Sequence, residues 1–258
     1  KTIEELQIWL LNNKRKNDWN TTKATTEATY ALLLQGKDWL SVEGTAKIKI
    51  ANNLIDTNTL NETKLEAGTG YFKTSWRGNV ISKEMANITI KNTSEVTQFG
   101  GYYWQYFEQL DKITSEEHKN DIQLNKALFL KKNTDNGPTL IKVEKTNLKV
   151  GDLVTIRIEL HVKDNFEFIH LKDMRASTFE PVSVLSSYKW QDGTGYYQST
   201  KDVATHFFFD NLKKGTYVLE YDVRVNNAGD FSNGISTIQS MYAPEFGSHS
   251  KGIRVSIH

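Results

Sequence analysis

The segment DLVTIRIELHVKDNFEFIHLKDM, residues 152–174, contains two strand-like runs separated by a short polar break. Runs of this kind recur roughly every 10 to 15 residues through the second half of the chain, with turn residues between them, as in all-β sandwiches. Two of the turns are well specified, one by Gly193 with Gly195 and the other by Lys213-Lys214-Gly215. The second half of the chain is therefore predicted to be a β-sandwich.

The first forty residues have helical periodicity instead. Apolar residues recur on one face of residues 2–14, and a second stripe of alanine and leucine follows in residues 19–40. Asn20 or Thr21 is the expected N-cap of the second helix, and Gly36 is expected just past its end. Because a lone helical hairpin buries too little surface to be stable, we expect it to be the tail of a larger helical domain.

From about Thr45 the period changes from 3.6 to 2. The segment TAKIKIANNLI, residues 45–55, alternates apolar residues with lysines, which is typical of a strand with one wet face. GTGYFKTSW, residues 68–76, is interpreted in the same way. FGGYYWQYFEQLDKI, residues 99–113, is denser in aromatic residues and is predicted to be a buried strand, with a helix as the alternative for its second half. The predicted fold class is mainly β, with β-sandwich domains of macroglobulin or fibronectin type and a short α-helical hairpin at the N-terminus.

Charge and composition exclude several classes of function. The 258 residues carry 32 basic and 31 acidic side chains without a basic block, so neither nucleic acid nor an anionic membrane is an expected partner. The absence of cysteine excludes disulfides, thiolate metal sites and a cysteine nucleophile in this chain. No apolar run approaches the ~18 residues of a membrane span. Because the chain starts at Lys1 within a helical pattern, we expect a piece of a longer protein whose targeting signal lies upstream.

The closing segment SMYAPEFGSHSKGIRVSIH, residues 240–258, raises the question of a hydrolase. Ser248, His249 and Ser250 are adjacent, and His258 ends the chain. Adjacent residues of an extended segment point to opposite sides, and the chain has no G-x-S-x-G nucleophile motif. We therefore predict a turn here and no enzyme activity. The six histidines lack metal-ligand spacing, so neither a metal nor a cofactor is expected.

An aromatic segment supports a second class of function. KWQDGTGYYQSTKDVATHFFF, residues 189–209, places Trp190, Tyr196 and Tyr197 close together. These side chains either fill the core of the sandwich or form a platform on which sugars stack. The alternative function is therefore an envelope glycan-binding β-sandwich module.

Charged residues in the same region allow two further interpretations, a structural ion pair and a glycosidase site. Asp173 and Arg175 share one face of an extended strand and are expected to form a structural ion pair at the surface, worth about 0–1 kcal/mol. A glycosidase needs two carboxylates within ~10 Å of each other, which a sequence cannot establish. The carboxylates of the predicted sandwich that could supply such a pair are Asp164, Asp173, Glu180, Asp192, Asp202 and Asp210.

Several segments, taken in order, resemble bacterial alpha-2-macroglobulins, most closely those of the Bacteroidetes type. The helical WNTTKATTEATYALLL resembles the closing helices of their α/α thioester domain, and FGGYYWQYFEQLDKI resembles the segment leaving the flanking β-domain. Five further segments resemble parts of the last macroglobulin-like domain of these proteins: LKVGDLVTIRIELHV, FEFIHLKDMRASTFEPV, YKWQDGTGYYQSTKD, LKKGTYVLEYDVRVNNAGDFSNG and MYAPEFGSHSKG. The resemblance implies three regions: the end of a thioester-type domain in residues 1–40, a CUB-like β-domain in 41–118, and a macroglobulin-like sandwich in 119–258.

The resemblance also implies a function. Such proteins are endopeptidase inhibitors of the cell envelope, in which cleavage of a bait region drives a conformational change that traps the attacking protease. The partners would be the upstream domains of the same polypeptide and, through the full-length parent, proteases. By position in the motif, Met241 and Tyr242 are candidates for a contact that shields the thioester from water; the alternative is an apolar pair buried at a strand end. This chain has no cysteine, so the thioester cannot lie within it, and it has no recognisable bait segment. Some bacterial members of the family lack the thioester, and in such a parent Met241 and Tyr242 would have nothing to shield.

Overall fold

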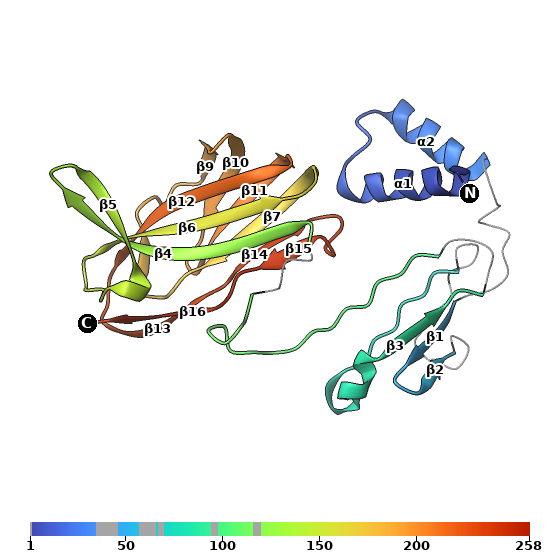
Figure 1. The fold of residues 1–258 in the computed structure, drawn as a ribbon, viewed down its shortest axis with the longest axis horizontal. Coiled ribbons are helices and arrows are strands. Elements are labelled where there is room, and N and C mark those ends of the chain that lie inside the picture. Colours follow the sequence, from blue (N-terminus) through green and yellow to red (C-terminus); the bar gives the residue numbers. More distant parts are fainter. Residues whose placement is uncertain (1, 35–45, 57–65, 67–69, 94–97, 116–119) are drawn as a thin grey trace. The chain divides into compact units, whose positions relative to one another are not determined.

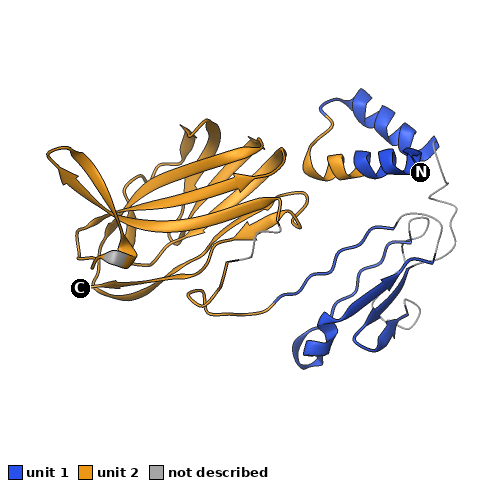
Figure 2. Ribbon diagram, viewed as in Figure 1, with its two compact units in different colours: residues 1–10, 20–105 blue, residues 11–19, 106–258 orange. Residues whose placement is uncertain are grey.

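The computed structural model describes residues 2–34, 46–56, 66, 70–93, 98–115 and 120–258. The chain forms two compact units (Figure 2), one of residues 1–10 and 20–105 and the other of residues 11–19 and 106–258. The expected domain limits near residues 40 and 118, and the expected helix end at Gly36, lie outside the described residues.

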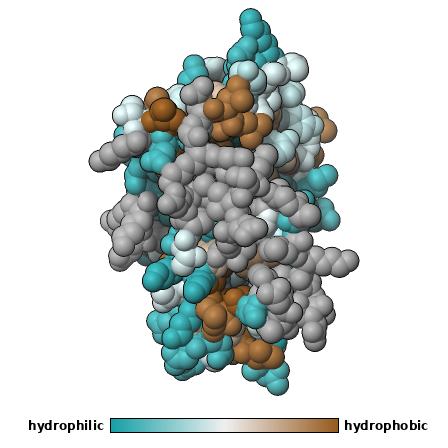
Figure 3. Space-filling model, turned by 90° about the vertical axis from the view of Figure 1, so that its right-hand side faces the viewer, coloured by the Kyte–Doolittle hydropathy of each residue, from teal (hydrophilic) through white to brown (hydrophobic). Residues whose placement is uncertain are grey.

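Two helices open the chain, α1 (Thr2–Lys16) and α2 (Thr22–Leu34) (Figure 1). The hydroxyl of Thr21 accepts a hydrogen bond from the backbone N–H of Ala24 at 3.1 Å, so Thr21 is the N-cap of α2. A second bond, from Gln7 Nε2 to the carbonyl of Leu32, joins the helices at 3.1 Å. Several apolar side chains of both helices remain exposed, and hydrophobic patches lie among hydrophilic residues on the face in Figure 3.

A small antiparallel sheet of order β2-β1-β3 follows, built from β1 (Lys47–Ile50), β2 (Asn53–Ile55) and β3 (Ile88–Lys91). Two 3₁₀ turns, Gly78–Val80 and Lys83–Ala86, precede β3. β1 is therefore a strand, as the alternation of isoleucine and lysine predicts.

Two strand predictions in this region are wrong. Residues 70–77 and 98–109 form neither a helix nor a strand, and they pair with no strand among the described residues. The rings of Tyr103, Tyr106 and Phe107 are exposed rather than buried. Aromatic residues favour strands only when a neighbouring strand offers a surface to pack on, and composition does not reveal that neighbour.

The rest of the chain forms a β-sandwich (Figure 1). One sheet has the order β15-β14-β7-β11-β10-β9, and the other has the order β5-β4-β6-β12-β8. A two-stranded ribbon pairs β13 with β16. The bounds are β4 (Ile122–Thr134), β5 (Gly137–Lys142), β6 (Leu153–Val162), β7 (Phe166–Met174), β8 (Phe179–Pro181), β9 (Ser187–Gln191), β10 (Thr194–Thr200), β11 (Ala204–Leu212), β12 (Gly215–Val225), β13 (Gly229–Gly234), β14 (Ser236–Ser240), β15 (Gly247–His249) and β16 (Ile253–Ile257), with a 3₁₀ turn at Val143–Lys145.

The core lies between the two sheets. In β6 every second side chain is fully buried, from Val154 through Ile158 to Val162, and β6 pairs with β4 on one side and β12 on the other. Burying an aliphatic side chain of this size stabilises the fold by roughly 1.5–3 kcal/mol. The predicted class, mainly β with a sandwich and two N-terminal helices, is confirmed.

The turn predicted at Gly193 is also confirmed. Asp192 and Gly193 both have positive φ, at 48° and 79°, between the paired residues Gln191 and Thr194. Two such residues form the tight hairpin turn whose twist matches the flanking strands. The turn joins β10 to β9, which is one of the two edge strands of the six-stranded sheet.

Candidate functional site

The closing segment contains a strand where a turn was predicted. Residues 247–249 form β15, which pairs with β14, and the turn lies just before it, at residues 241–246. His249 Nδ1 lies 3.1 Å from the carbonyl oxygen of Ser250, and the Ser250 hydroxyl accepts a hydrogen bond from the N–H of Ser236 at 3.0 Å. These side-chain groups therefore contact backbone groups of the sheet, in an arrangement unlike a catalytic triad.

Met241 and Tyr242 lie in this turn and are exposed, at 54% and 79%, so the alternative of a buried pair does not hold. The turn itself is anchored. Ser240 N–H donates to the carbonyl of Phe246 at 2.9 Å, and Ala243 is buried beneath the turn. The backbone of the turn is thus fixed, and it holds the side chains of Met241 and Tyr242 at the surface of the domain.

The side chain of Phe168, in β7, packs against Tyr242. Its ring meets that of Tyr242 edge to face, with centroids 5.3 Å apart and planes at 88°. The N–H of Met241 donates to the carbonyl of Phe168 at 2.9 Å, which extends the pairing of β14 with β7. Phe168 has φ of 55°, a left-handed conformation that is a genuine outlier for a bulky residue. Phe168, Met241 and Tyr242 thus form a small exposed apolar surface, called here the 168/241/242 surface.

The three aromatic residues of the alternative glycan platform do not lie together. Tyr196 points into the core, where its hydroxyl donates to Gln191 Oε1 at 3.0 Å and burial raises its pKa to about 12. Tyr197 is half-buried and packs edge-on against Tyr188, with centroids 5.1 Å apart. Trp190 is exposed and lies over Gly195, where a Cβ atom would come within 2.9 Å of the indole.

The expected surface pair of Asp173 and Arg175 is wrong, because both residues are buried and neither pairs with the other. Arg175 donates to the Thr205 hydroxyl at 3.0 Å and to the carbonyl of Asp202 at 3.0 Å. Asp173 pairs instead with Lys126, whose Nζ lies 2.6 Å from Oδ1. Asp173 lies near the end of β7 and Arg175 directly follows the strand, and both side chains are buried rather than turned to the solvent.

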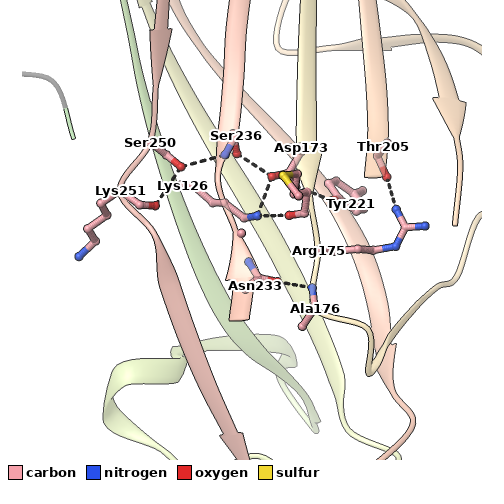
Figure 4. A network of polar contacts seen from close by, with 12 residues as sticks. Lys126, Asp173, Arg175, Ala176, Thr205, Tyr221, Asn233, Ser236, Ser250 and Lys251 are labelled. Atoms are coloured by element: carbon pink, nitrogen blue, oxygen red, sulfur yellow. Dashed lines mark hydrogen bonds and ion pairs between the residues drawn. The ribbon is translucent and has the colours of Figure 1, made fainter. Parts of the chain in front are cut away.

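Asp173 is the centre of a buried polar network between the two sheets (Figure 4). It accepts hydrogen bonds from the Tyr221 hydroxyl at 2.5 Å and the Ser236 hydroxyl at 2.6 Å. Burial lowers the pKa of Lys126, and burial together with the Asp173 charge raises the pKa of Tyr221. Lys126 also donates to the carbonyl of Met174.

Sequence reasoning missed Lys126, although a signal was present. In IQLNKALFL, residues 122–130, the lysine occupies the same face as Ile122, Leu124 and Leu128. A charge in an otherwise apolar inward row requires a buried partner. That partner, Asp173, occupies a similar inward position in β7.

Two histidines meet on the outer face of the six-stranded sheet. His170 Nε2 and His206 Nδ1 are 2.9 Å apart, the rings are parallel within 1°, and Phe208 stacks on His170. Burial lowers the pKa of both imidazoles, the neighbouring charge of Lys172 lowers both further, and the His206 charge adds to the effect on His170. In the described part of the chain, no three histidine, aspartate or glutamate side chains are grouped to hold a metal ion. None of the described helices is long and apolar enough to cross a membrane.

The two packed antiparallel sheets define the class of this domain: it is a β-sandwich. Residues 122–245 match the family model of the bacterial alpha-2-macroglobulin MG10 domain. Residues 122–245 therefore form a domain of the bacterial alpha-2-macroglobulin family, and the resemblance predicted from the sequence of this part of the chain is confirmed.

Solved structures of the same family are similar to the chain at low identity. Trypsin-activated alpha-2-macroglobulin from Escherichia coli is 11% identical, with 96% of this chain and 16% of that chain covered and a TM-score of 0.47. Salmonella alpha-2-macroglobulin reacted with methylamine is 14% identical, with 99% and 16% covered and a TM-score of 0.43. The Escherichia coli protein from domain MG7 to the C-terminus is 14% identical, with 54% and 24% covered and a TM-score of 0.42. The chain thus spans a quarter or less of the length of these proteins. No curated protein matches it.

Proposed function

We propose that the chain is the non-catalytic, C-terminal part of a bacterial alpha-2-macroglobulin-like endopeptidase inhibitor of the cell envelope. The match of residues 122–245 to the MG10 domain carries this proposal. Within it, residues 1–40 end a thioester-type domain, 41–118 belong to the flanking CUB-like domain, and 119–258 form the last macroglobulin-like domain. The partners are the upstream domains of the same polypeptide and, through them, the trapped protease.

The test of this proposal uses the full-length parent and a broad-specificity protease. After incubation, protease activity is measured on a large protein substrate and on a small peptide substrate. A trap predicts loss of activity on the large substrate with retention on the small one, since the enclosed active site still admits peptides. Protease inactivated before mixing is the control, because without cleavage of the parent no enclosure is expected. Equal activity on both substrates would remove the inhibitor function.

Within the trap, we propose that Met241 and Tyr242 contact the thioester domain and shield its reactive bond from water. Three observations support this: both side chains are exposed, the Phe168 ring supports Tyr242, and the turn is anchored by Ala243. Apolar side chains held outward by a fixed backbone lose little conformational entropy when a partner covers them.

The shielding role is tested in the parent with Tyr242→Ala. We expect faster release of a free thiol on exposure to methylamine, because removal of the ring admits the nucleophile. Tyr188→Ala is the matched control, since Tyr188 is a tyrosine of the same domain with comparable exposure, 77%. An unchanged rate in Tyr242→Ala, or no thiol release from the unmutated parent, would refute the shielding role.

One observation favours glycan binding as a second candidate function. Tyr188 and Trp190 are both exposed on the edge strand β9, beside a shallow depression of about 440 Å³ that also contains Asp210. The platform would then be this pair, without Tyr196. Titration with soluble cell-wall oligosaccharides should quench tryptophan fluorescence in the chain and not in Trp190→Ala. No change in fluorescence at saturating oligosaccharide would dismiss the candidate.

A further inference from the structure

Lys126 and Asp173 form the most completely enclosed ion pair of the described residues. Both side chains have no solvent-exposed surface, and Nζ lies 2.6 Å from Oδ1. Lys126 comes from β4 in the five-stranded sheet and Asp173 from β7 in the six-stranded sheet, so the pair joins the two layers of the sandwich (Figure 4). It lies within the buried network, among Tyr221, Ser236 and the carbonyl of Met174.

Two features favour a reaction between these groups. An amine at this distance from a carboxyl oxygen is about 3–3.5 Å from the carboxyl carbon, the separation of a near-attack arrangement. Two charges in a dry core are costly, because burial removes their hydration. Condensation to an amide would remove both charges and release the water to the solvent.

We propose that Lys126 and Asp173 form an intramolecular amide bond that covalently joins the two sheets. The Lys126 ammonium transfers one proton to Asp173 Oδ1, and the neutral amine attacks Cγ. A second proton moves from nitrogen to the same oxygen, the Cγ–Oδ1 bond breaks, and Oδ1 leaves as water. The product is an Nζ–Cγ amide, and neither an oxidant, a cofactor nor a further reactant is needed.

The neighbouring hydroxyls are placed to assist. Tyr221 donates to Oδ2, the oxygen on which negative charge develops when nitrogen attacks, and thus serves as an oxyanion donor. Ser236 donates to Oδ1, the leaving oxygen. Burial raises the pKa of Tyr221, so its hydroxyl keeps the proton it donates, and burial lowers the pKa of Lys126, which favours the neutral amine.

The same domain contains an internal control. Lys131 and Asp222 form a pair at 2.7 Å, nearly the same distance, but their side chains are 28% and 27% exposed. Water stabilises both charges there, so this pair is expected to remain ionic. Proximity alone would predict reaction at both pairs, whereas burial predicts reaction only at Lys126 and Asp173.

The experiment is the mass of the intact, denatured chain measured after purification. The proposal predicts a mass lower than that of the sequence by one water molecule. Tryptic digestion should then yield a branched peptide that joins residues 120–131 to residues 173–175, because the modified Lys126 is no longer cleaved. The full sequence mass would overturn the proposal and leave an ion pair only, as would a loss of water located at Lys131 and Asp222.

Variants test how each residue contributes to formation of the amide bond. Lys126→Met and Asp173→Ala should each have the full mass, whereas Lys131→Met should still lose one water. Tyr221→Phe removes only the donor to Oδ2, so the fraction of cross-linked chain at a fixed time after synthesis should fall several-fold. A cross-linked fraction equal to that of the unmutated chain would refute the role of Tyr221. The mass of the unmutated chain tests the bond even if the core variants do not fold.

Discussion

At the scale of single residues, the His170 and His206 pair links the stability of the sandwich to pH. A hydrogen bond between two imidazoles requires that at least one be neutral, and burial lowers the pKa of both. The nearby Lys172, Lys201 and Arg175 add positive charge that opposes protonation. Below the unfolded-state pKa of about 6.5, the unfolded chain therefore binds more protons than the folded chain, and stability falls as pH falls.

We therefore expect the urea midpoint of the chain to decrease between pH 7.5 and pH 5.5. The variant His206→Gln should reduce this decrease, because it removes one of the two coupled imidazoles. His161→Gln is the control, since His161 lies outside the pair and contacts the Thr216 hydroxyl. A pH dependence in His206→Gln as steep as that of the unmutated chain would show that the pair does not contribute.

The Asp173 position allows a second prediction at this scale. Asp173→Ala removes the proposed amide bond and also leaves the Lys126 amine buried without its partner, and an unpaired buried charge typically costs about 3–5 kcal/mol. The double variant Lys126→Met with Asp173→Ala should recover the part of the loss that comes from the unpaired amine, because no charge then remains in the core, but not the part that comes from the missing cross-link. Urea unfolding of the two variants gives the comparison. Equal stability of the single and double variants would contradict the burial argument.

At the scale of elements, the end of β13 depends on a glycine. Gly234 has φ of 66°, and a Cβ atom there would lie 2.7 Å from the Cβ of Met174. The register of β13 and β16 shifts between Ser232 and Gly234, so this glycine forms an irregularity that brings the ribbon against β7. Both backbone conformation and space therefore require glycine.

Gly234→Ala is expected to destabilise the chain by about 2–4 kcal/mol, the sum of a left-handed backbone and an overpacked contact. Gly193→Ala should cost only about 1–2 kcal/mol, because its φ is also positive but no atom lies within 4 Å of the added methyl. Thermal unfolding of both variants measures the difference. If Gly234→Ala and Gly193→Ala lower the stability of the chain equally, the close contact with Met174 does not contribute to the destabilisation.

The elements also show what a sequence can reveal. Alternation predicts strands such as β1 and β6 because a half-buried pleated surface imposes a period of two. It does not identify the side chain that faces a residue across the core, so the sequence predicts a pair of Asp173 with the nearby Arg175, whereas the partner of Asp173 is Lys126 on the opposite sheet. The segment 99–113 was predicted to be buried from its aromatic content alone, and it has no partner strand among the described residues.

At the scale of the whole molecule, the order of the segments was more informative than any single motif. The helices, the small sheet and the sandwich follow one another along the chain, and the MG10 match covers residues 122–245 of the sandwich. The 168/241/242 surface depends on a positive φ at Phe168 and on the pairing of β14 with β7, neither of which the sequence indicates. The isolated chain therefore exposes a surface that the proposed parent would cover.

Amide hydrogen exchange of residues 240–246 tests this account most directly. It is measured in the intact parent, in the parent cleaved by a protease, and in the isolated chain. The account predicts slow exchange in the intact parent, and faster exchange after cleavage that approaches the rate of the isolated chain, because the conformational change uncovers Met241 and Tyr242. Equal exchange rates in all three would contradict the account, since the turn would then have no partner that proteolysis removes.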